Sequence, residues 1–127
     1  GKRGHEGTDL MPPTNQRGFY PVFSATAGTV EHMGWLQKGG WRIGIRSEQG
    51  GYFYYAHFSE YAPGMEEGKT VEAGEMLGYM GDSGYGEEGT VGQFAVHLHF
   101  GIYIQTADGR EVSVDPYWIL KGLEGEP

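Results

Sequence analysis

The chain contains no cysteine among its 127 residues. A disulfide framework and a thiolate zinc site are therefore both excluded, and any bound metal must use His, Asp or Glu. Basic residues are also scarce, because 9 Lys and Arg stand against 17 Asp and Glu and give a formal net charge of −8. Binding the phosphate backbone requires clustered Lys and Arg, so no nucleic-acid partner is expected. No apolar run of about 18 residues occurs, so no membrane span is visible.

Glycine, in contrast, is abundant. The chain has 24 glycines and 6 prolines without a collagen-like period, which is typical of many tight turns between short strands. With 38% hydrophobic residues, residues 1–127 can bury the modest core of a single domain. The sequence therefore predicts an all-β fold with an antiparallel sheet and little helix, the one expected helical turn being at 117–123.

Alternating apolar and polar residues locate the first strands. Residues 39–46 alternate, a glycine-containing turn follows, and the aromatic-rich segment 52–57 completes a predicted β-hairpin. Residues 69–71 and 76–80 are predicted to form two short strands joined by a turn at Gly74. Residues 81–92 hold five glycines and no apolar period, which predicts a surface loop at the edge of a groove.

The clearest strand is predicted over residues 95–104. Every even position from 96 to 104 is a large apolar residue, so these five side chains are expected to face the core. His97 and His99 then emerge together on the opposite face, because side chains alternate along a strand. The Asp108-Gly109 pair favours a tight reversal into a last strand at 111–114.

Four of the five histidines fall in three patterned segments: His5-Glu6-Gly7-Thr8-Asp9, Tyr55-Ala56-His57 and His97-Leu98-His99. Catalytic zinc typically takes three N/O protein ligands and keeps a further position for water. His5, Asp9 and His99 could fill that set. Zinc would lower the pKa of its bound water toward about 7, so that hydroxide could attack a peptide carbonyl at neutral pH.

Two histidines of these segments are then left for proton handling, His57 and His97. The fifth histidine, His32, matches no metal motif and is interpreted as an ordinary strand or turn residue. Which of His57 and His97 would act as the base stays open at this stage, because both have the same unperturbed pKa and their surroundings would decide.

The three histidine motifs, in this order, resemble those of the lysostaphin-like (LytM) metallopeptidases, peptidase family M23. The intervening sequence is similar too, and the similarity covers nearly the whole chain: Gly7-Thr8-Asp9-Leu10, Ala27-Gly28-Thr29-Val30, Gly68-Lys69-Thr70-Val71-Glu72-Ala73-Gly74, Gly78-Tyr79-Met80-Gly81 and Val114-Asp115-Pro116. The resemblance implies a partly closed barrel or sandwich, the barrel-sandwich hybrid or duplicated hybrid motif. It also implies one catalytic Zn²⁺ bound by His5, Asp9 and His99, with His57 and His97 assisting catalysis.

The function implied by this resemblance is a zinc endopeptidase, a peptidoglycan hydrolase that cuts cross-bridges or stem peptides. The protein is expected to act on a peptidoglycan peptide in the bacterial cell envelope or as a secreted enzyme, and a monomer is expected. Two departures affect specificity: Gly101 stands where the family usually has Glu, and the segment 86–94 is longer than its counterpart. The alternatives are a catalytically silent LytM-type domain that binds an envelope partner and a IIA-type phosphocarrier, which needs no Asp9.

Overall fold

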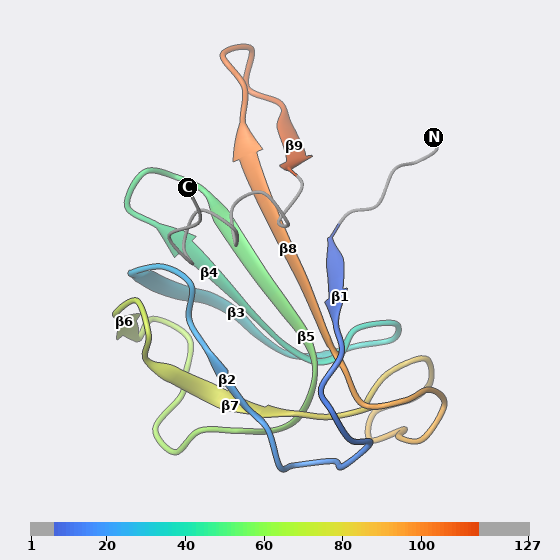
Figure 1. Cartoon of the computed structure of the whole chain (residues 1–127). Coiled ribbons are helices and arrows are strands. Elements are labelled where there is room, and N and C mark those ends of the chain that lie inside the picture. The colour runs from blue at the N-terminus through green and yellow to red at the C-terminus, as the bar shows by residue number, and fades with distance from the viewer. Residues whose placement is uncertain (1–6, 115–127) are drawn as a thin grey trace.

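The computed structural model describes residues 7–114 (Figure 1). His5 and the helical turn expected at 117–123 therefore lie outside the described residues. Nine strands follow one another in this part of the chain: β1 (Thr8–Leu10), β2 (Pro21–Phe23), β3 (Gly28–Leu36), β4 (Gly40–Ser47), β5 (Tyr52–Tyr61), β6 (Thr70–Val71), β7 (Met76–Met80), β8 (Leu98–Gln105) and β9 (Glu111–Val114).

All strand pairs are antiparallel. The sheet runs in the order β1-β8-β5-β4-β3-β6, with β7 branching from β5, β2 pairing with β7, and β9 pairing with β8. Figure 1 shows the β2–β7 ribbon lying across the lower part of the long strands. Residues 7–114 include no helix, and hence none long and apolar enough to cross a membrane. The predicted all-β antiparallel architecture is confirmed.

The hydrophobic core joins the β2–β7 ribbon to the long strands. Its buried members come from β2 to β8: Val22, Val30, Ile43, Ile45, Tyr55, Phe58, Val71, Leu77, Leu98, Phe100 and Ile102. Burying each large apolar side chain contributes roughly 1.5–3 kcal/mol before entropy losses. Because β5 and β8 both place residues in this core, the histidines that these strands carry stand on a rigid frame.

The predicted hairpin of 39–46 and 52–57 is confirmed as β4 and β5. The two short strands predicted at 69–71 and 76–80 also form, as β6 and β7. They do not pair with each other, since β6 pairs with β3 whereas β7 pairs with β2 and β5. The turn between them, closed by the Glu75 amide donating to the Glu72 carbonyl at 3.0 Å, sends the chain from one part of the sheet to the other.

The predicted strand at 95–104 appears as β8, which begins at Leu98. Val96, Leu98, Phe100 and Ile102 are buried as expected. Ile104 is 43% exposed, so the prediction that it faces the core was wrong. β5 begins at Tyr52, which pairs with Tyr103, so β8 extends past the end of β5 and has only β9 beside it at Ile104.

The segment 81–92 is not entirely a surface loop. Residues 81–84 are buried, and isolated bridges join Gly81 to His97 and Ser83 to Val91. The Ser83 hydroxyl donates to the Phe58 carbonyl at 2.7 Å and accepts from the Trp41 amide at 3.2 Å. Ser83 therefore makes its hydrogen bonds inside the protein, whereas the composition of the segment predicted that it would face solvent.

Candidate functional site

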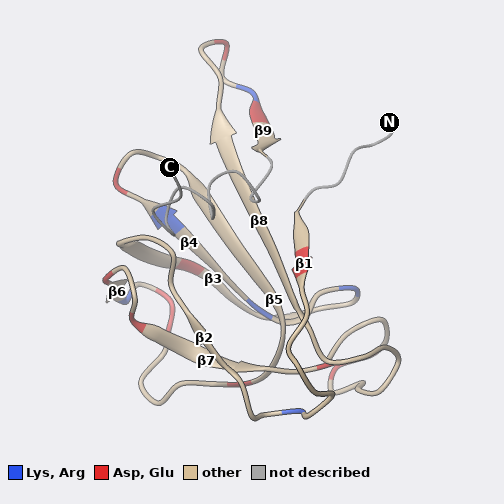
Figure 2. Ribbon diagram, viewed as in Figure 1, with Lys and Arg blue, Asp and Glu red and all other residues tan. Residues whose placement is uncertain are grey.

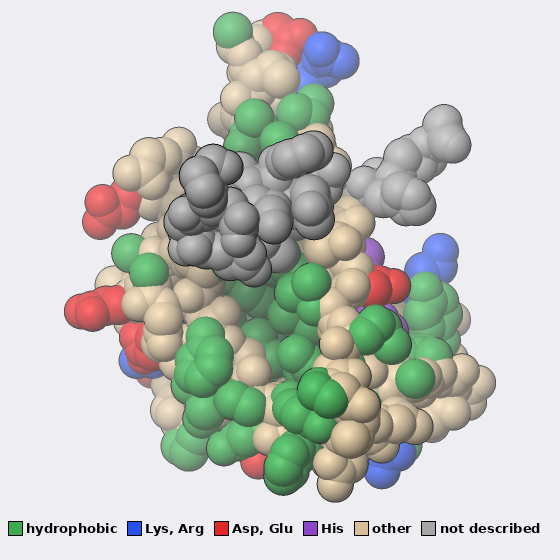
Figure 3. Space-filling model, viewed as in Figure 1, with side chains coloured by type: hydrophobic (Ala, Val, Ile, Leu, Met, Phe, Trp, Pro, Cys, Tyr) green, Lys and Arg blue, Asp and Glu red, His purple; other side chains and the backbone are tan. Residues whose placement is uncertain are grey.

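Strand pairing collects the sequence-predicted residues of the described chain at one place. Asp9 of β1 is the register partner of His99 of β8, and Ala56 of β5 is the partner of His99 on its other side. His97 precedes β8, and His57 follows Ala56. In the space-filling view, histidine side chains are visible next to an acidic one (Figure 3). Three segments that are far apart in the sequence therefore contribute Asp9, His57, His97 and His99 to one cluster.

The distances within the cluster are short. Asp9 Oδ1 lies 2.8 Å from His99 Nδ1 and 3.7 Å from His97 Nε2. The ring centroids of His57 and His97 are 4.8 Å apart, and those of His57 and His99 are 6.2 Å apart. Four side chains with proton-accepting or metal-binding atoms therefore face one small volume.

Asp9 and His99 have the chemistry of a pair of zinc ligands. Their side chains are 55% and 32% exposed, so a carboxylate oxygen and a ring nitrogen converge where solvent still has access. Hard oxygen and imidazole nitrogen donors without thiolate suit Zn²⁺. His5, the predicted third ligand, lies outside the described residues, and within residues 7–114 no group of three or more His, Asp and Glu side chains forms a metal site by itself.

Gly7, between the predicted ligands His5 and Asp9, is required by close packing. Its φ is +146°, and a Cβ on it would lie 2.7 Å from the Phe100 carbonyl oxygen and 2.9 Å from His99 Nε2. A side chain here would push β1 away from β8. The glycine therefore lets the Asp9 carboxylate approach the His99 ring.

His57 is aimed by a bulge in β5. Its φ is +70°, which is unusual for a residue with a side chain. The β4–β5 register shifts between the pairs Trp41–Phe58 and Ile43–Tyr55, and the His57 amide donates to the Gly39 carbonyl at 2.8 Å. Bulges and strained backbone concentrate at functional sites, where they redirect a side chain. Here the bulge directs the imidazole of His57 toward those of His97 and His99.

The protonation state of His57 follows from its surroundings. Burial lowers its pKa to about 4, against an opposing hydrogen bond to the Ser83 carbonyl. Its Nδ1 lies 2.7 Å from that carbonyl oxygen, which can only accept, so Nδ1 carries the hydrogen. His57 is therefore neutral near pH 7 and its Nε2 holds a free lone pair. By the same reasoning His97 donates from Nδ1 to the Ala95 carbonyl at 2.9 Å.

Several residues around His57 were not singled out by the sequence patterns. Phe94 packs edge-on against its ring at 4.6 Å and Tyr85 stacks at 6.3 Å. Gly84 lets this loop reach the ring, since a Cβ there would lie 2.3 Å from the Lys38 carbonyl oxygen and 3.1 Å from His57 Nδ1. The only hint in the sequence is the spacing of glycines around Tyr85, which also occurs in ordinary turns.

Replacing Gly84 with Ala is expected to destabilise the protein by about 2–4 kcal/mol, because steric overlap adds to the cost of a left-handed backbone. Gly89 is a matched control, as its φ is +95° and nothing lies within 4 Å of a Cβ there. Gly89→Ala should cost only about 1–2 kcal/mol. Denaturant unfolding of both variants measures the difference. Equal losses would show that the contact of Gly84 with Lys38 and His57 is not tight.

Comparison with known proteins agrees with this geometry. Residues 3–116 match the model of peptidase family M23, and the chain belongs to that family. It is 46% identical over 125 residues to the L-Ala–D-Glu endopeptidase of Bacillus subtilis, covering 98% of this chain and 36% of that protein. The family predicted from the three histidine motifs is thereby confirmed.

Solved structures share the fold. A structure described as a glycyl-glycine endopeptidase LytM from Ruminococcus gnavus is 59% identical with a TM-score of 0.89, covering 98% of this chain and 49% of that one. The catalytic domain of lysostaphin from Staphylococcus simulans is 30% identical with a TM-score of 0.69, covering 92% and 79%. The chain thus spans about a third of the B. subtilis protein and half of the R. gnavus chain.

Proposed function

We propose that this chain is a zinc-dependent endopeptidase that hydrolyses peptide bonds in peptidoglycan. The observation that carries the proposal is the convergence of Asp9 and His99 beside the two further imidazoles of His57 and His97. Hydrolysis of an amide can use a metal ion that activates water together with side chains that accept and donate protons. Asp9 and His99 could bind the metal, and His57 and His97 could transfer the protons. The relatives named as an L-Ala–D-Glu endopeptidase and as a glycyl-glycine endopeptidase support the same chemistry.

In this proposal His5, Asp9 and His99 hold the metal. When bound, Zn²⁺ supplies a Lewis acid for the scissile carbonyl and a water whose pKa is lowered toward about 7. Burial keeps the ring of His57 neutral. The lone pair on its Nε2 can therefore accept a proton.

His97 directs Nε2 to the same side, toward Asp9. Because the Nδ1 hydrogen of His97 is donated to the Ala95 carbonyl, its Nε2 must first take up a proton. The protonated ring can then hydrogen-bond to a developing oxyanion or give that proton to the leaving amine.

A peptidoglycan substrate would place this activity in the bacterial cell envelope or outside the cell. The bond cut is the finer question. The B. subtilis relative is named for an L-Ala–D-Glu bond, whereas the R. gnavus structure is named for a glycyl-glycine bond. The first bond lies beside a residue with a free carboxylate, and the second does not. Recognition of that carboxylate would therefore distinguish the two substrates.

Digestion of peptidoglycan tests the proposed function. Zinc-loaded protein should release new amino termini from peptidoglycan whose peptides contain L-Ala–D-Glu or oligoglycine, and sequencing these termini identifies the bond. No new amino terminus from either material, with folded and zinc-loaded protein, would contradict the proposal and favour a catalytically silent domain. Transfer of phosphate to a histidine from a phosphorylated carrier protein would favour the phosphocarrier alternative instead.

A further inference from the structure

We propose that Lys38 is a specificity-determining residue that binds a free carboxylate of the peptide substrate next to the scissile bond. A glutamate residue, which keeps one carboxyl group outside its peptide bonds, has the required chemistry. This inference rests on the proposed endopeptidase function and selects an acidic peptide over an oligoglycine as its substrate. It is carried by the placement of Lys38, its lack of a partner and the exposed ring of Tyr85, which lies in the loop that hydrogen-bonds to the Lys38 turn.

Lys38 lies in the turn between β3 and β4, which is fastened to the site at several points. The carbonyl of the next residue, Gly39, accepts the His57 amide at 2.8 Å, and that of the preceding Gln37 accepts the Gly86 amide at 3.1 Å. The indole of Trp35 donates to the Gly86 carbonyl, also at 3.1 Å. The backbone of Lys38 is thus fixed relative to His57, while its side chain is exposed.

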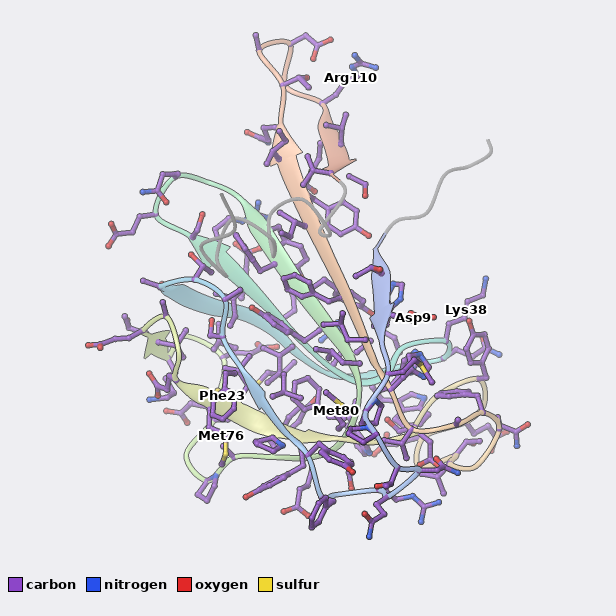
Figure 4. All side chains as sticks on the ribbon, viewed as in Figure 1. Asp9, Phe23, Lys38, Met76, Met80 and Arg110 are labelled. Carbon is purple, nitrogen blue, oxygen red and sulfur yellow. The ribbon has the colours of Figure 1, made fainter. Side chains whose placement is uncertain are left out.

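The Lys38 side chain can be followed in the stick view. It projects outward from the turn on the side of the molecule where Asp9 lies (Figure 4). The backbone of Lys38 lies close to His57, because a Cβ on Gly84 would touch both the Lys38 carbonyl oxygen and His57 Nδ1. The exposed Lys38 side chain therefore starts beside the cluster, from where it can reach a bound substrate.

Lys38 differs from the other basic residues in its interactions. Within residues 7–114 it is the only Lys or Arg side chain without an ion pair or hydrogen bond. Each of the other five has a partner. Arg17 pairs with Asp82, Arg46 with Glu31 and Glu111, Lys69 with Glu75 and Arg110 with Asp108, and Arg42 donates to the Met33 carbonyl. Figure 2 shows the few basic positions of residues 7–114 spread over the ribbon. In a chain of net charge −8, one unpaired cation at the rim offsets the repulsion of an anionic peptide.

Tyr85 supplies a second, independent observation. Its φ is +57°, a left-handed conformation that favours glycine, and glycines stand on both sides of it. The side chain is nevertheless 58% exposed and stacks over His57 at 6.3 Å. Neither backbone geometry nor burial accounts for a tyrosine here, and residues in such backbone conformations cluster at functional sites. Its ring offers a flat apolar wall for the methylene groups of a glutamate side chain.

The test compares two peptides that differ only in charge. Both contain L-Ala–D-Glu, and the carboxyl group of D-Glu that is outside the peptide linkage is either free or a carboxamide. Wild-type protein should show a kcat/KM about 3- to 10-fold higher for the free carboxylate, the modest gain of a partly exposed ion pair. This preference should shrink as ionic strength rises, because salt screens exposed charges. Lys38→Gln should cleave both peptides at the rate that wild type reaches with the carboxamide.

A control removes a charge elsewhere. Lys69→Gln deletes one lysine near β6, where the Lys69 ammonium pairs with Glu75, and should leave the preference of wild type intact. Equal cleavage of the two peptides by wild type, or an unchanged preference in Lys38→Gln, would overturn the role of Lys38 while the endopeptidase function stands. Cleavage of oligoglycine alone would do the same. Cleavage of no peptide by zinc-loaded protein would overturn the proposed function and, with it, this inference.

Discussion

The variant His99→Ala is expected to lose zinc and peptidase activity together. His99 Nδ1 lies 2.8 Å from Asp9 Oδ1, so the substitution removes one of the two described donors of the proposed site. Mutating a residue that hydrogen-bonds to a metal ligand typically lowers metal affinity by roughly 10–100-fold. Losing the ligand itself should lower zinc affinity by more than that. Metal content per chain and the rate of peptide cleavage are measured on the same preparation.

The fold should survive this change. His99 is not part of the buried hydrophobic core, and its side chain is 32% exposed. A far-ultraviolet circular dichroism spectrum like that of wild type would confirm this. His32→Ala is a matched control, because His32 is exposed and contacts Tyr52 rather than the cluster, and it should keep both zinc and activity. If His99→Ala keeps its zinc while His97→Ala loses it, the proposed roles of the two histidines are reversed.

Variants of His57 and His97 should behave in the opposite way and keep zinc while losing activity. A positioned acid or base typically contributes 10²–10⁴-fold to a rate, so a loss of about that size is expected for each. His97→Ala is suitable because His97 is only partly buried. For His57 the better choice is His57→Asn, since Asn tolerates the backbone conformation at φ +70° and its amide can still donate to the Ser83 carbonyl.

The two measurements separate the possible explanations for such a loss. Zinc content equal to wild type, together with an unchanged unfolding midpoint, would show that the lost activity is a loss of proton handling. Full hydrolysis by both variants would show that neither imidazole takes part in the reaction. In that case the short distances between His57, His97 and His99 would have only a structural meaning.

Much of the fold and of the site follows from local sequence patterns. The alternation in residues 96–102 predicted the buried face of β8 and placed His97 and His99 on its other face. The histidine motifs identified four residues that the structure brings together, although they lie on segments up to 90 positions apart. The predicted buried face is correct because side-chain alternation is a local property of a strand. The roles of the four clustered residues in binding metal and transferring protons stay predictions.

The features that sequence patterns missed depend on partners distant in the chain. Ile104 is exposed because β5 ends before it, and the burial of Ser83 depends on Phe58 and Trp41. The bulge at His57 requires the Gly39 carbonyl, and Lys38 gains significance only because the β3–β4 turn is fastened to the loop carrying Tyr85. Local periodicity contains no information about such long-range contacts.

Removal and return of the metal tests the central claim most directly. Protein freed of metal by a chelator should release no new amino termini from peptidoglycan peptides, and activity should return in proportion to added Zn²⁺ up to one ion per chain. His99→Ala should not recover in the same titration. Hydrolysis that continues at the wild-type rate in metal-free protein would contradict the account.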